Sequence, residues 1–235
     1  MPSPRIAPAE RHAALRRPDR RSLSDSVAEA IADGIADGHL VPGDRVIETA
    51  IAAQLDVSRV PVREALKILH AQGILDGEAH KGYRVVSFGS ETVHQLLEIR
   101  IALETVLLRD ALAAWRLDPR GAVVLERPLT EMRRAAAAHD VTGVLKADLN
   151  FHRTISEAAD NHIARTLWQT IARHVLIVFS LEQRHVDELP AVVGQHEELL
   201  AFIARQLRAR PSEAGIRKVM EDHILAVARR RARRD

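Results

Sequence analysis

The spacing of hydrophobic positions differs between two parts of the chain. In residues 22–87, short apolar stripes alternate with turn-forming Gly, Pro and Asp residues. In residues 90–232, apolar positions recur every three or four residues almost without a break. That spacing is typical of amphipathic helices. The pattern therefore predicts two domains that meet near Ser87–Ser90, the second of them built of helices alone.

The first part is predicted to contain three short helices and a β-hairpin. Its first helix is marked by apolar residues at helical spacing, namely Val27, Ile31 and Ile35. Gly38 has the place of a C-cap after this helix. A Pro-Gly turn then leads to a short second helix over IETAIAAQL, residues 47–55.

The third helix follows the second after a tight turn of only two residues, Asp56 and Val57. Ser58 is a good N-cap, and Pro61 lies in the first turn, where its missing N–H is harmless. One face is apolar and consists of Val62, Ala65, Leu66 and Leu69. Apolar residues then flank the polar tip AHKG, which predicts a hairpin. Helix, short helix, tight turn, helix and hairpin is the order of a winged helix-turn-helix domain.

The second part is predicted to form an antiparallel bundle of about six helices, which makes the fold class mainly α. The expected ranges are 90–116, 120–138, 141–159, 161–183, 189–208 and 212–232. Pro128 falls inside the second range. A proline in a helix interior removes a hydrogen bond and clashes with the preceding turn. We therefore expect the second helix to be kinked or broken there.

Composition narrows the class of protein. The 235 residues are 46% hydrophobic, enough for a core, and only 3% aromatic, which argues against the base-stacking surfaces of single-strand binders. Cysteine is absent, which excludes disulfides and thiolate metal sites and fits a reducing cytoplasm. No segment resembles a signal peptide, and no apolar run is long enough to span a bilayer. We expect a cytoplasmic protein without a membrane partner.

The net charge is only +2, but basic residues are concentrated at both ends of the chain. The first 21 residues contain six arginines, and the chain ends in ARRRARRD. The Pro- and Arg-rich composition of residues 1–21 predicts a disordered basic arm. Two interpretations of the ends stay open, namely solvated, frayed termini or arms that seek phosphates.

The third helix of the first domain carries a basic ridge beside its apolar face. On a helix that starts near Arg59, the ridge consists of Arg59, Arg63, Lys67 and His70. The major groove of B-DNA admits a helix, and arginine can bind guanine O6 and N7 with two donors. Arg59 and Arg63 are therefore the candidates for base contacts. The other candidate DNA-binding residues are Ser58, Thr49, Lys67, Lys81 and Gly82. The alternative is a solvated amphipathic helix.

This segment resembles the DNA-binding domain of a known family. PGDRVIETAIAAQLDVSRVPVREALKILHAQGIL, ending in HKGYRVV, is similar to that of the GntR family of bacterial regulators, over residues 23–86. The resemblance implies that Arg59 and Arg63 are recognition-helix arginines and that Gly82 is the wing glycine. Thr49 departs from the pattern, because some relatives have a DNA-contacting arginine there, so operator preference is expected to differ.

Four polar residues interrupt the apolar faces of the second domain, namely Asp148, His152, His196 and His223. Asp148 and His152 are one turn apart and share a helix face. Burying such groups without a partner is costly. Two readings stay open: each is a hydrogen-bonded core residue, or they converge on a metal ion. Imidazole and carboxylate suit zinc, nickel or manganese, and bundles build such sites from facing helices.

A second resemblance bears on this choice. DLNFHRTISEAADNHIARTLW is similar to the motif of FCD, the effector domain in the FadR-like branch of the GntR family, with a match over about 92–230. It implies that the four polar residues bind a divalent metal, with zinc the first expectation. The gap from His196 to His223 is longer than in the family. We expect an insertion within LRARPSEAG; a shift in helix phase would instead remove His223 from the site.

Two arginines are candidates for binding an effector. Arg100 shares an apolar stripe with Leu96, Leu103 and Leu107, and a buried arginine needs a carboxylate partner. Glu104, one turn on, is one such partner. The other reading is an anion clamp for a carboxylate effector at the metal, because family members often sense small organic acids. Arg173 is the second, weaker candidate.

The resemblance implies a ligand-responsive regulator that binds a near-palindromic DNA operator as a homodimer. Repression relieved by a ligand is the commoner mode in the family. A metal-dependent hydrolase is a second hypothesis, because HEELL superficially resembles a zinc-protease motif. That motif needs a second histidine where this chain has Leu200, so we expect no enzyme. A DNA-binding protein with a purely structural metal is the third hypothesis.

Overall fold

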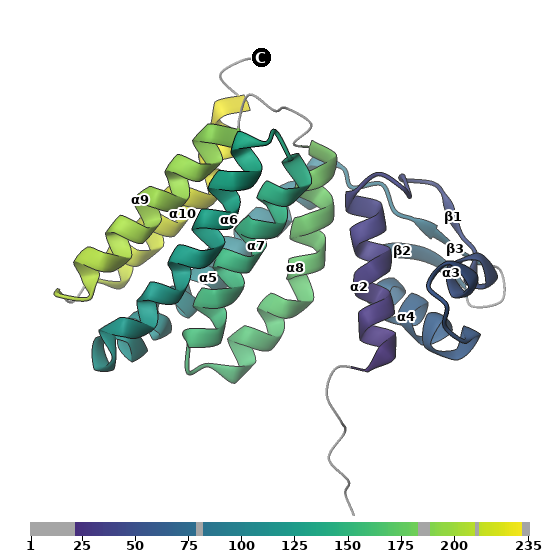
Figure 1. The fold of residues 1–235 in the computed structure, drawn as a ribbon, viewed down its shortest axis with the longest axis horizontal. Coiled ribbons are helices and arrows are strands. Elements are labelled where there is room, and N and C mark those ends of the chain that lie inside the picture. Colours follow the sequence, from purple (N-terminus) through teal and green to yellow (C-terminus); the bar gives the residue numbers. More distant parts are fainter. Residues whose placement is uncertain (1–21, 79–81, 183–188, 210–211, 232–235) are drawn as a thin grey trace, which may run out of the picture.

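The computed structural model describes residues 22–78, 82–182, 189–209 and 212–231 and places them in two lobes (Figure 1). The smaller lobe holds the first three helices and a small sheet, and the larger lobe is a helical bundle. The fold class is therefore mainly α, as predicted. The basic arm predicted for residues 1–21, the candidate Lys81 and the last four residues of the chain lie outside the described residues.

The smaller lobe is a winged helix-turn-helix. Its helices are α2 (Leu23–Ala36), α3 (Glu48–Gln54) and α4 (Arg59–Ala71), and its strands are β1 (Arg45–Val46), β2 (Leu75–Glu78) and β3 (Gly82–Val85). All three predicted helices and the hairpin are confirmed. The strands form an antiparallel sheet in the order β1-β3-β2, with Arg45 opposite Arg84. Strand β1 was not predicted, because two residues are too few to show an alternating pattern.

Local sequence explains how α2 and α4 begin and end. The Ser22 side chain accepts a hydrogen bond from the Asp25 N–H at 3.2 Å and caps α2. Gly38 follows the helix with a φ of +80°, a conformation that glycine adopts at little cost. Ser58 occupies the N-cap position of α4 as predicted, but its side chain makes no capping hydrogen bond within the described structure. The Ser58 hydroxyl is thus not committed to its own helix.

The larger lobe contains the six predicted α-helices and one additional 3-10 helix. In chain order they are α5 (Ser90–Leu117), η1 (Pro119–Leu125), α6 (Glu126–Ala137), α7 (Val141–Ala158), α8 (His162–Glu182), α9 (Leu189–Gln206) and α10 (Glu213–Arg231). The predicted helix 120–138 is thus broken, but the break precedes Pro128 rather than falling on it. Pro128 lies in the first turn of α6, where no N–H is needed.

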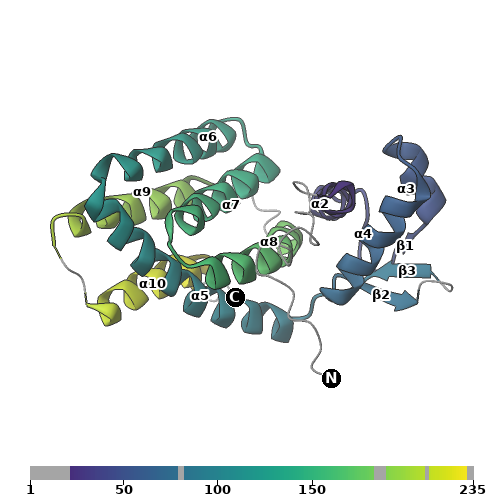
Figure 2. The same ribbon diagram turned by 90° about the horizontal axis from the view of Figure 1, so that it is seen from below.

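The bundle core and the smaller lobe share helix α8. Helix α5 packs against α7, α8 and α10, and the core around them includes the fully buried Phe151 and Trp168. Helix α8 lies beside α2 of the smaller lobe (Figures 1 and 2), and Ile177 of α8 is buried in the core of that lobe. Every described helix is too short or too polar to cross a membrane.

Candidate functional site

Helix α4 separates a buried face from a basic face. Its buried residues are the predicted ones, Val62, Ala65, Leu66 and Leu69. Arg59 and Arg63 lie on the opposite face, with 61% and 48% of their side chains exposed. The N-terminal half of α4 therefore presents two guanidinium groups to solvent, in the position from which recognition helices reach base edges.

Both arginines are held by one carboxylate from α3. Arg59 Nε lies 2.7 Å from Glu48 Oε1, while Arg63 donates to Glu48 through Nε and Nη2, at 3.1 Å each. The hydrogen bond from Arg63 lowers the pKa of Glu48, so the carboxyl stays ionised. Glu48 thus fixes the direction of both side chains. Sequence reasoning missed this residue, because its partners lie on another helix.

The remaining candidate DNA contacts lie around this pair. Ser58 and Thr49 are exposed near the N-termini of α4 and α3. Lys67 is exposed but bound to Glu64 at 2.8 Å. Gly82 opens β3 with a φ of +91°, and a Cβ atom there would lie 3.0 Å from Nε of Arg45. A side chain at position 82 would therefore strain the backbone and crowd the sheet.

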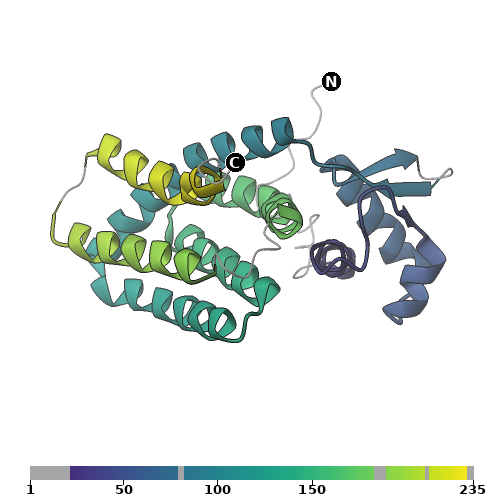
Figure 3. The same ribbon diagram turned by 90° about the horizontal axis from the view of Figure 1, so that it is seen from above.

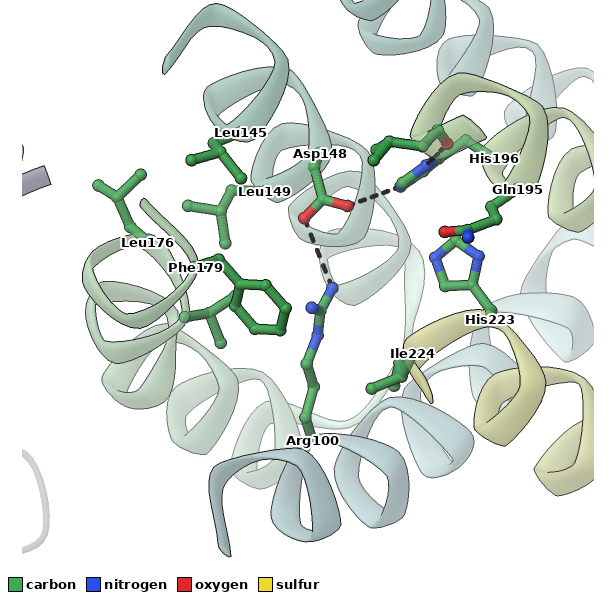
Figure 4. Close-up of a pocket in the computed structure, with 12 residues that line it drawn as sticks. Arg100, Leu145, Asp148, Leu149, Leu176, Phe179, Gln195, His196, His223 and Ile224 are labelled. Atoms are coloured by element: carbon green, nitrogen blue, oxygen red, sulfur yellow. Dashed lines mark hydrogen bonds and ion pairs between the residues drawn. The ribbon is translucent and has the colours of Figure 1, made fainter. Parts of the chain in front are cut away.

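The four polar residues that interrupt the apolar faces converge in the bundle. Asp148 and His152 come from α7, His196 from α9 and His223 from α10, and one ligand atom from each lies within 4.8 Å of all the others. Figure 4 shows Asp148, His196 and His223 directed into a common space. His223 lies on α10, beyond the connection that follows α9, and it keeps its place in the group.

The hydrogen bonds of His196 expose a lone pair toward Asp148. Its Nδ1 lies 2.8 Å from the carbonyl oxygen of Val192, and a carbonyl only accepts, so Nδ1 carries the hydrogen. In neutral imidazole the other nitrogen, Nε2, then presents a lone pair. This atom is buried, makes no hydrogen bond with the described residues and lies 2.8 Å from Asp148 Oδ1. The Nε2 lone pair and the Asp148 carboxylate repel each other at this distance. A metal ion between them, or a second proton on the ring, would remove the repulsion.

His152 is oriented in the same way by a residue that sequence reasoning had not linked to it. Its Nδ1 lies 2.5 Å from Oε2 of Glu104 on α5, so Nδ1 donates to a carboxylate. Nε2 then faces the group and lies 3.1 Å from Nε2 of His223. Carboxylates that hold the far nitrogen of a ligating histidine are usual in metal sites. The donor set and its support therefore fit a divalent ion such as zinc.

Arg100 places a positive charge beside Asp148 and the three histidines. Its Nε lies 2.5 Å from Glu104 Oε1 and its Nη2 lies 3.5 Å from Asp148 Oδ2. Burial disfavours the charged carboxyl of Asp148, but Arg100 and the neighbouring His196 and His152 together outweigh burial and lower the pKa of Asp148 well below its usual range. Burial likewise disfavours the charged carboxyl of Glu104, but Arg100 and His152 together outweigh it, and the pKa of Glu104 falls to about 2. The ionised carboxylates of Glu104 and Asp148 and the guanidinium of Arg100 together carry one net negative charge.

A small cavity borders the four residues. Its volume is about 30 Å³, which is room for little more than one water molecule. Arg100, Asp148, His196 and His223 line it together with apolar side chains that include Phe179 (Figure 4). A bound ion would add two positive charges and turn the cavity into a site for anions.

The chain matches known regulators over both lobes. Residues 23–85 match the model for bacterial regulatory proteins of the gntR family, and residues 95–226 match the FCD domain. The second match alone spans more than half of the chain. The protein belongs to the GntR family. Its FCD domain is the helical bundle, and its winged helix-turn-helix is the GntR DNA-binding domain.

Individual relatives of this GntR-family protein agree with that assignment. It is 30% identical over 169 residues to the probable D-xylose utilization operon transcriptional repressor of Paenarthrobacter nicotinovorans, covering 72% of this chain and 74% of that one. It is 28% identical over 135 residues to the regulator YdhC of Bacillus subtilis, where the match spans 59% of the relative. McbR/YncC of E. coli has the same fold, with a TM-score of 0.73 at 24% identity, over 92% of this chain and 100% of that one.

These relatives and domains are transcriptional regulators and not enzymes, which confirms that expectation. Local structure agrees: Glu197, the acidic residue of the HEELL stretch, is bound to Arg133 on α6 at 2.9 Å. It therefore lies in an ion pair on the bundle surface. Position 200, where a zinc protease of that motif needs its second histidine, is Leu200.

Arg173, the other candidate for effector binding, lies at the junction of the two lobes. Its Nη1 donates to Gln72 Oε1 at 3.3 Å, and the neighbouring His174 contacts the Gln72 carbonyl at 2.7 Å. It lines a cleft of about 1080 Å³ between α2 and the bundle, not the small cavity at Asp148. Leu149 and Leu176 line both spaces and form the wall between them.

Proposed function

We propose that this GntR-family protein is a ligand-responsive repressor that binds a near-palindromic operator as a dimer, in the cytoplasm of its bacterium. A small organic acid, bound beside a divalent metal in the FCD domain, changes its affinity for the operator. One observation carries this proposal. Four ligand-type side chains from three helices meet within 4.8 Å, with Arg100 beside them.

The operator-binding part of the proposal rests on α4. Arg59 and Arg63 are exposed, point from the start of the helix and are pre-oriented by Glu48. In the proposal they read base edges, with Arg63 paired to a guanine. Ser58 and Thr49 donate to phosphates, and Lys67, Lys81 and Gly82 contribute contacts along the helix and at the wing. Two copies related by a two-fold axis read the two half-sites.

The metal is proposed to be zinc, with nickel and manganese as alternatives. Asp148, His152, His196 and His223 would hold it, with Glu104 fixing the orientation of His152. The ion's contribution is positive charge at the cavity, which attracts a carboxylate. Arg100 supplies a second cationic group on the same side of the cavity, so an acid bound there meets both.

The size of the cavity implies that an effector moves side chains. A space of about 30 Å³ accepts no organic acid without enlargement. The wall formed by Leu149 and Leu176 separates it from the much larger cleft that Arg173 lines. An acid that displaces this wall would extend from the metal toward Arg173. Because the cleft lies between the two lobes, such a ligand would alter how the DNA-binding domain rests on the bundle.

The same small cavity favours a second candidate function. Arg100 already has two carboxylate partners, the buried Glu104 and Asp148, whose side chain is 14% exposed. A metal that only stabilises the bundle would need no larger space. This alternative is a DNA-binding protein with a structural metal, whose operator affinity does not respond to small acids.

A melting-temperature screen separates the two candidates. Metal-loaded protein is heated with sugar acids, hydroxy acids, dicarboxylates and aromatic acids, and each hit is repeated after chelation. A ligand that binds only the native state raises the melting temperature by mass action. The proposal predicts a shift that disappears with the metal. No shift for any acid, with the metal confirmed present, would favour the structural metal.

A further inference from the structure

Val60 is an apolar side chain on helix α4 that lies outside the core of its own domain. It is 68% exposed. The residues that attach α4 to the rest of the lobe are buried, namely Val62, Ala65, Leu66 and Leu69. With about 3.6 residues per turn, these buried positions centre on one side of the helix and position 60 falls on the opposite side. Val60 therefore points directly away from the domain that carries it.

The charged side chains around Val60 are paired with one another. The two arginines of α4 border the same exposed face, and Glu48 of α3 holds both of them. Glu64 and Lys67 lie about one and two turns after Val60 and form an ion pair at 2.8 Å. Val60 is thus an apolar group in the middle of a charged surface.

Stability of the helix does not explain a valine at this position. A β-branched side chain loses χ1 freedom in a helix, and alanine favours a helix more. At 68% exposure, Val60 also gains little from removal of apolar surface from water. The same branching holds the side chain in nearly one rotamer, so a contact made by Val60 costs little further conformational entropy. The side chain is therefore well suited to contact an apolar group outside the protein.

The start of α4 is open to an external partner. Gln72, the C-cap of α4, contacts two side chains of α8, so the C-terminal end of α4 lies against the bundle. Figures 2 and 3 both show α3 on the side of the smaller lobe away from the bundle. Because Glu48 of α3 binds Arg59, the start of α4 lies on that side as well. The bundle therefore does not obstruct the approach to Val60.

We propose that Val60 recognises the 5-methyl group of a thymine in the operator. This inference rests on the proposed function, which places the exposed face of α4 in the major groove. Every base edge in that groove presents hydrogen-bonding groups, and thymine is the one base that also presents a methyl group. The side chain of Val60 neither donates nor accepts a hydrogen bond. Contact with this methyl group is therefore the favourable base contact open to it.

The position of the thymine follows from that of Arg63. Side chains three residues apart on a helix are roughly 5–6 Å apart at Cβ, and successive base pairs are about 3.4 Å apart along the duplex. The thymine is therefore expected within about two base pairs of the guanine proposed for Arg63, in each half-site. Arg63 and Val60 then specify neighbouring bases, the first by hydrogen bonds and the second by apolar contact.

Replacement of thymine by deoxyuridine tests the inference, because deoxyuridine lacks only the methyl group. The operator is first selected from random duplexes by the full-length wild-type protein. Each thymine of one half-site is then replaced in turn, and binding is measured by fluorescence anisotropy. At one thymine we expect wild-type affinity to fall roughly three- to tenfold, as burial of one or two methyl groups implies. Val60→Ala is expected to bind the thymine and deoxyuridine operators equally.

Two controls separate this contact from other effects. Val123→Ala is the matched variant, because Val123 is 65% exposed on η1, outside the DNA-binding domain. It should keep the full difference between thymine and deoxyuridine. The free energy of unfolding of Val60→Ala should equal or exceed that of the parent, because alanine is the better helix former. A loss of affinity in Val60→Ala would then not come from a weaker fold.

Three results would overturn the inference. The first is a selected operator without a thymine within about two base pairs of the guanine that Arg63 recognises. The second is wild-type protein that is indifferent to deoxyuridine at every thymine, and the third is Val60→Ala protein that still distinguishes the two bases as the parent does. In each case, weaker operator binding by Arg63→Ala would leave the proposed function standing. Wild-type protein that selects no sequence would reject both.

A second substitution restores the methyl group on another base. Cytosine in place of the thymine is expected to weaken wild-type binding. We expect 5-methylcytosine to recover part of the loss, because it carries its methyl group at the same place in the major groove. Val60→Ala should bind the cytosine and 5-methylcytosine operators equally. Equal affinity of the wild-type protein for these two operators would contradict the contact.

Discussion

Arg63 and Arg100 are each bound to a glutamate, yet one pair lies in water and the other in the core. The side chains of Arg63 and Glu48 are 48% and 19% exposed, whereas those of Arg100 and Glu104 are 5% and 4% exposed. A solvated ion pair contributes little to stability, so DNA can replace Glu48 as the partner of Arg63 at small cost. A buried pair cannot exchange partners freely, because either charge left alone in the core is heavily destabilised. The first pair is thus suited to recognition and the second to holding a site in place.

The largest expected effect comes from breaking the buried pair. In metal-free protein, Arg100→Ala leaves Glu104 and Asp148 as uncompensated buried carboxylates, and we expect the free energy of unfolding to fall by about 3–5 kcal/mol. Urea denaturation measures this loss. Arg59→Ala is the control on the exposed side and is expected to leave the unfolding curve nearly unchanged. Equal losses in the two variants would mean that the two environments do not differ as described.

A smaller effect is expected when the support of the proposed metal site is weakened and its proposed ligands are kept. Glu104→Gln preserves size but removes the carboxylate that orients His152, and we expect metal affinity to fall by roughly 10- to 100-fold. Competition with a chromogenic chelator measures this affinity. Glu197→Gln is the matched control, because Glu197 follows the proposed ligand His196 in sequence yet is bound to Arg133. If both variants bind metal like the parent, Glu104 has no orienting role.

The role of the exposed pair, Arg63 and Glu48, is tested by measuring operator binding. Arg63→Ala is expected to weaken operator binding by roughly tenfold to a hundredfold and to relax base preference at one position of each half-site. Lys67→Ala should have a smaller effect, equal on all sequences, because the contact proposed for Lys67 is with phosphates, which carry no base information. Titration of operators with single base changes distinguishes these results. An Arg63→Ala protein that keeps both affinity and base preference would remove Arg63 from the readout.

The smallest effect is expected from Glu48→Gln. This change keeps the side chain's shape but loses its charge, so the two arginines are less firmly oriented before binding. We expect base discrimination to decline by a few-fold while the thermal stability stays that of the parent. A variant that discriminates between operators as well as the parent does would show that DNA alone orients Arg59 and Arg63.

Periodicity predicted most of the fold, because each helix shows its own apolar stripe. The helices of the bundle begin and end within a few residues of the expected positions. The failures are short elements: β1 has two residues, and η1 replaces the start of the predicted helix 120–138. Strand β1 is too short to show an alternating pattern, and η1 was predicted as part of a helix but not as a separate 3-10 segment. Pro128 was identified as a break, but the chain accommodates it by starting a new helix just before it.

The four side chains that meet in the candidate site were predictable from the sequence, and the residues that orient them were not. Asp148, His152, His196 and His223 are conspicuous as polar residues on apolar faces, and a family resemblance groups them. Glu48 contacts Arg63, which is 15 positions away in the sequence, and Glu104 contacts His152, which is 48 positions away. No local sequence pattern reveals contacts at these separations. The position of Arg173 at Gln72, 101 residues away, is likewise a product of how the two lobes pack.

The most direct test of the account is the operator affinity of metal-loaded protein, measured with and without an acid that raises its melting temperature. His152→Ala protein, depleted of metal, is the control. The account predicts that the acid changes operator affinity by roughly 5- to 150-fold in the parent only, and that operator DNA changes the affinity for the acid by the same factor. An operator affinity that is the same with and without the acid in metal-loaded protein would contradict it.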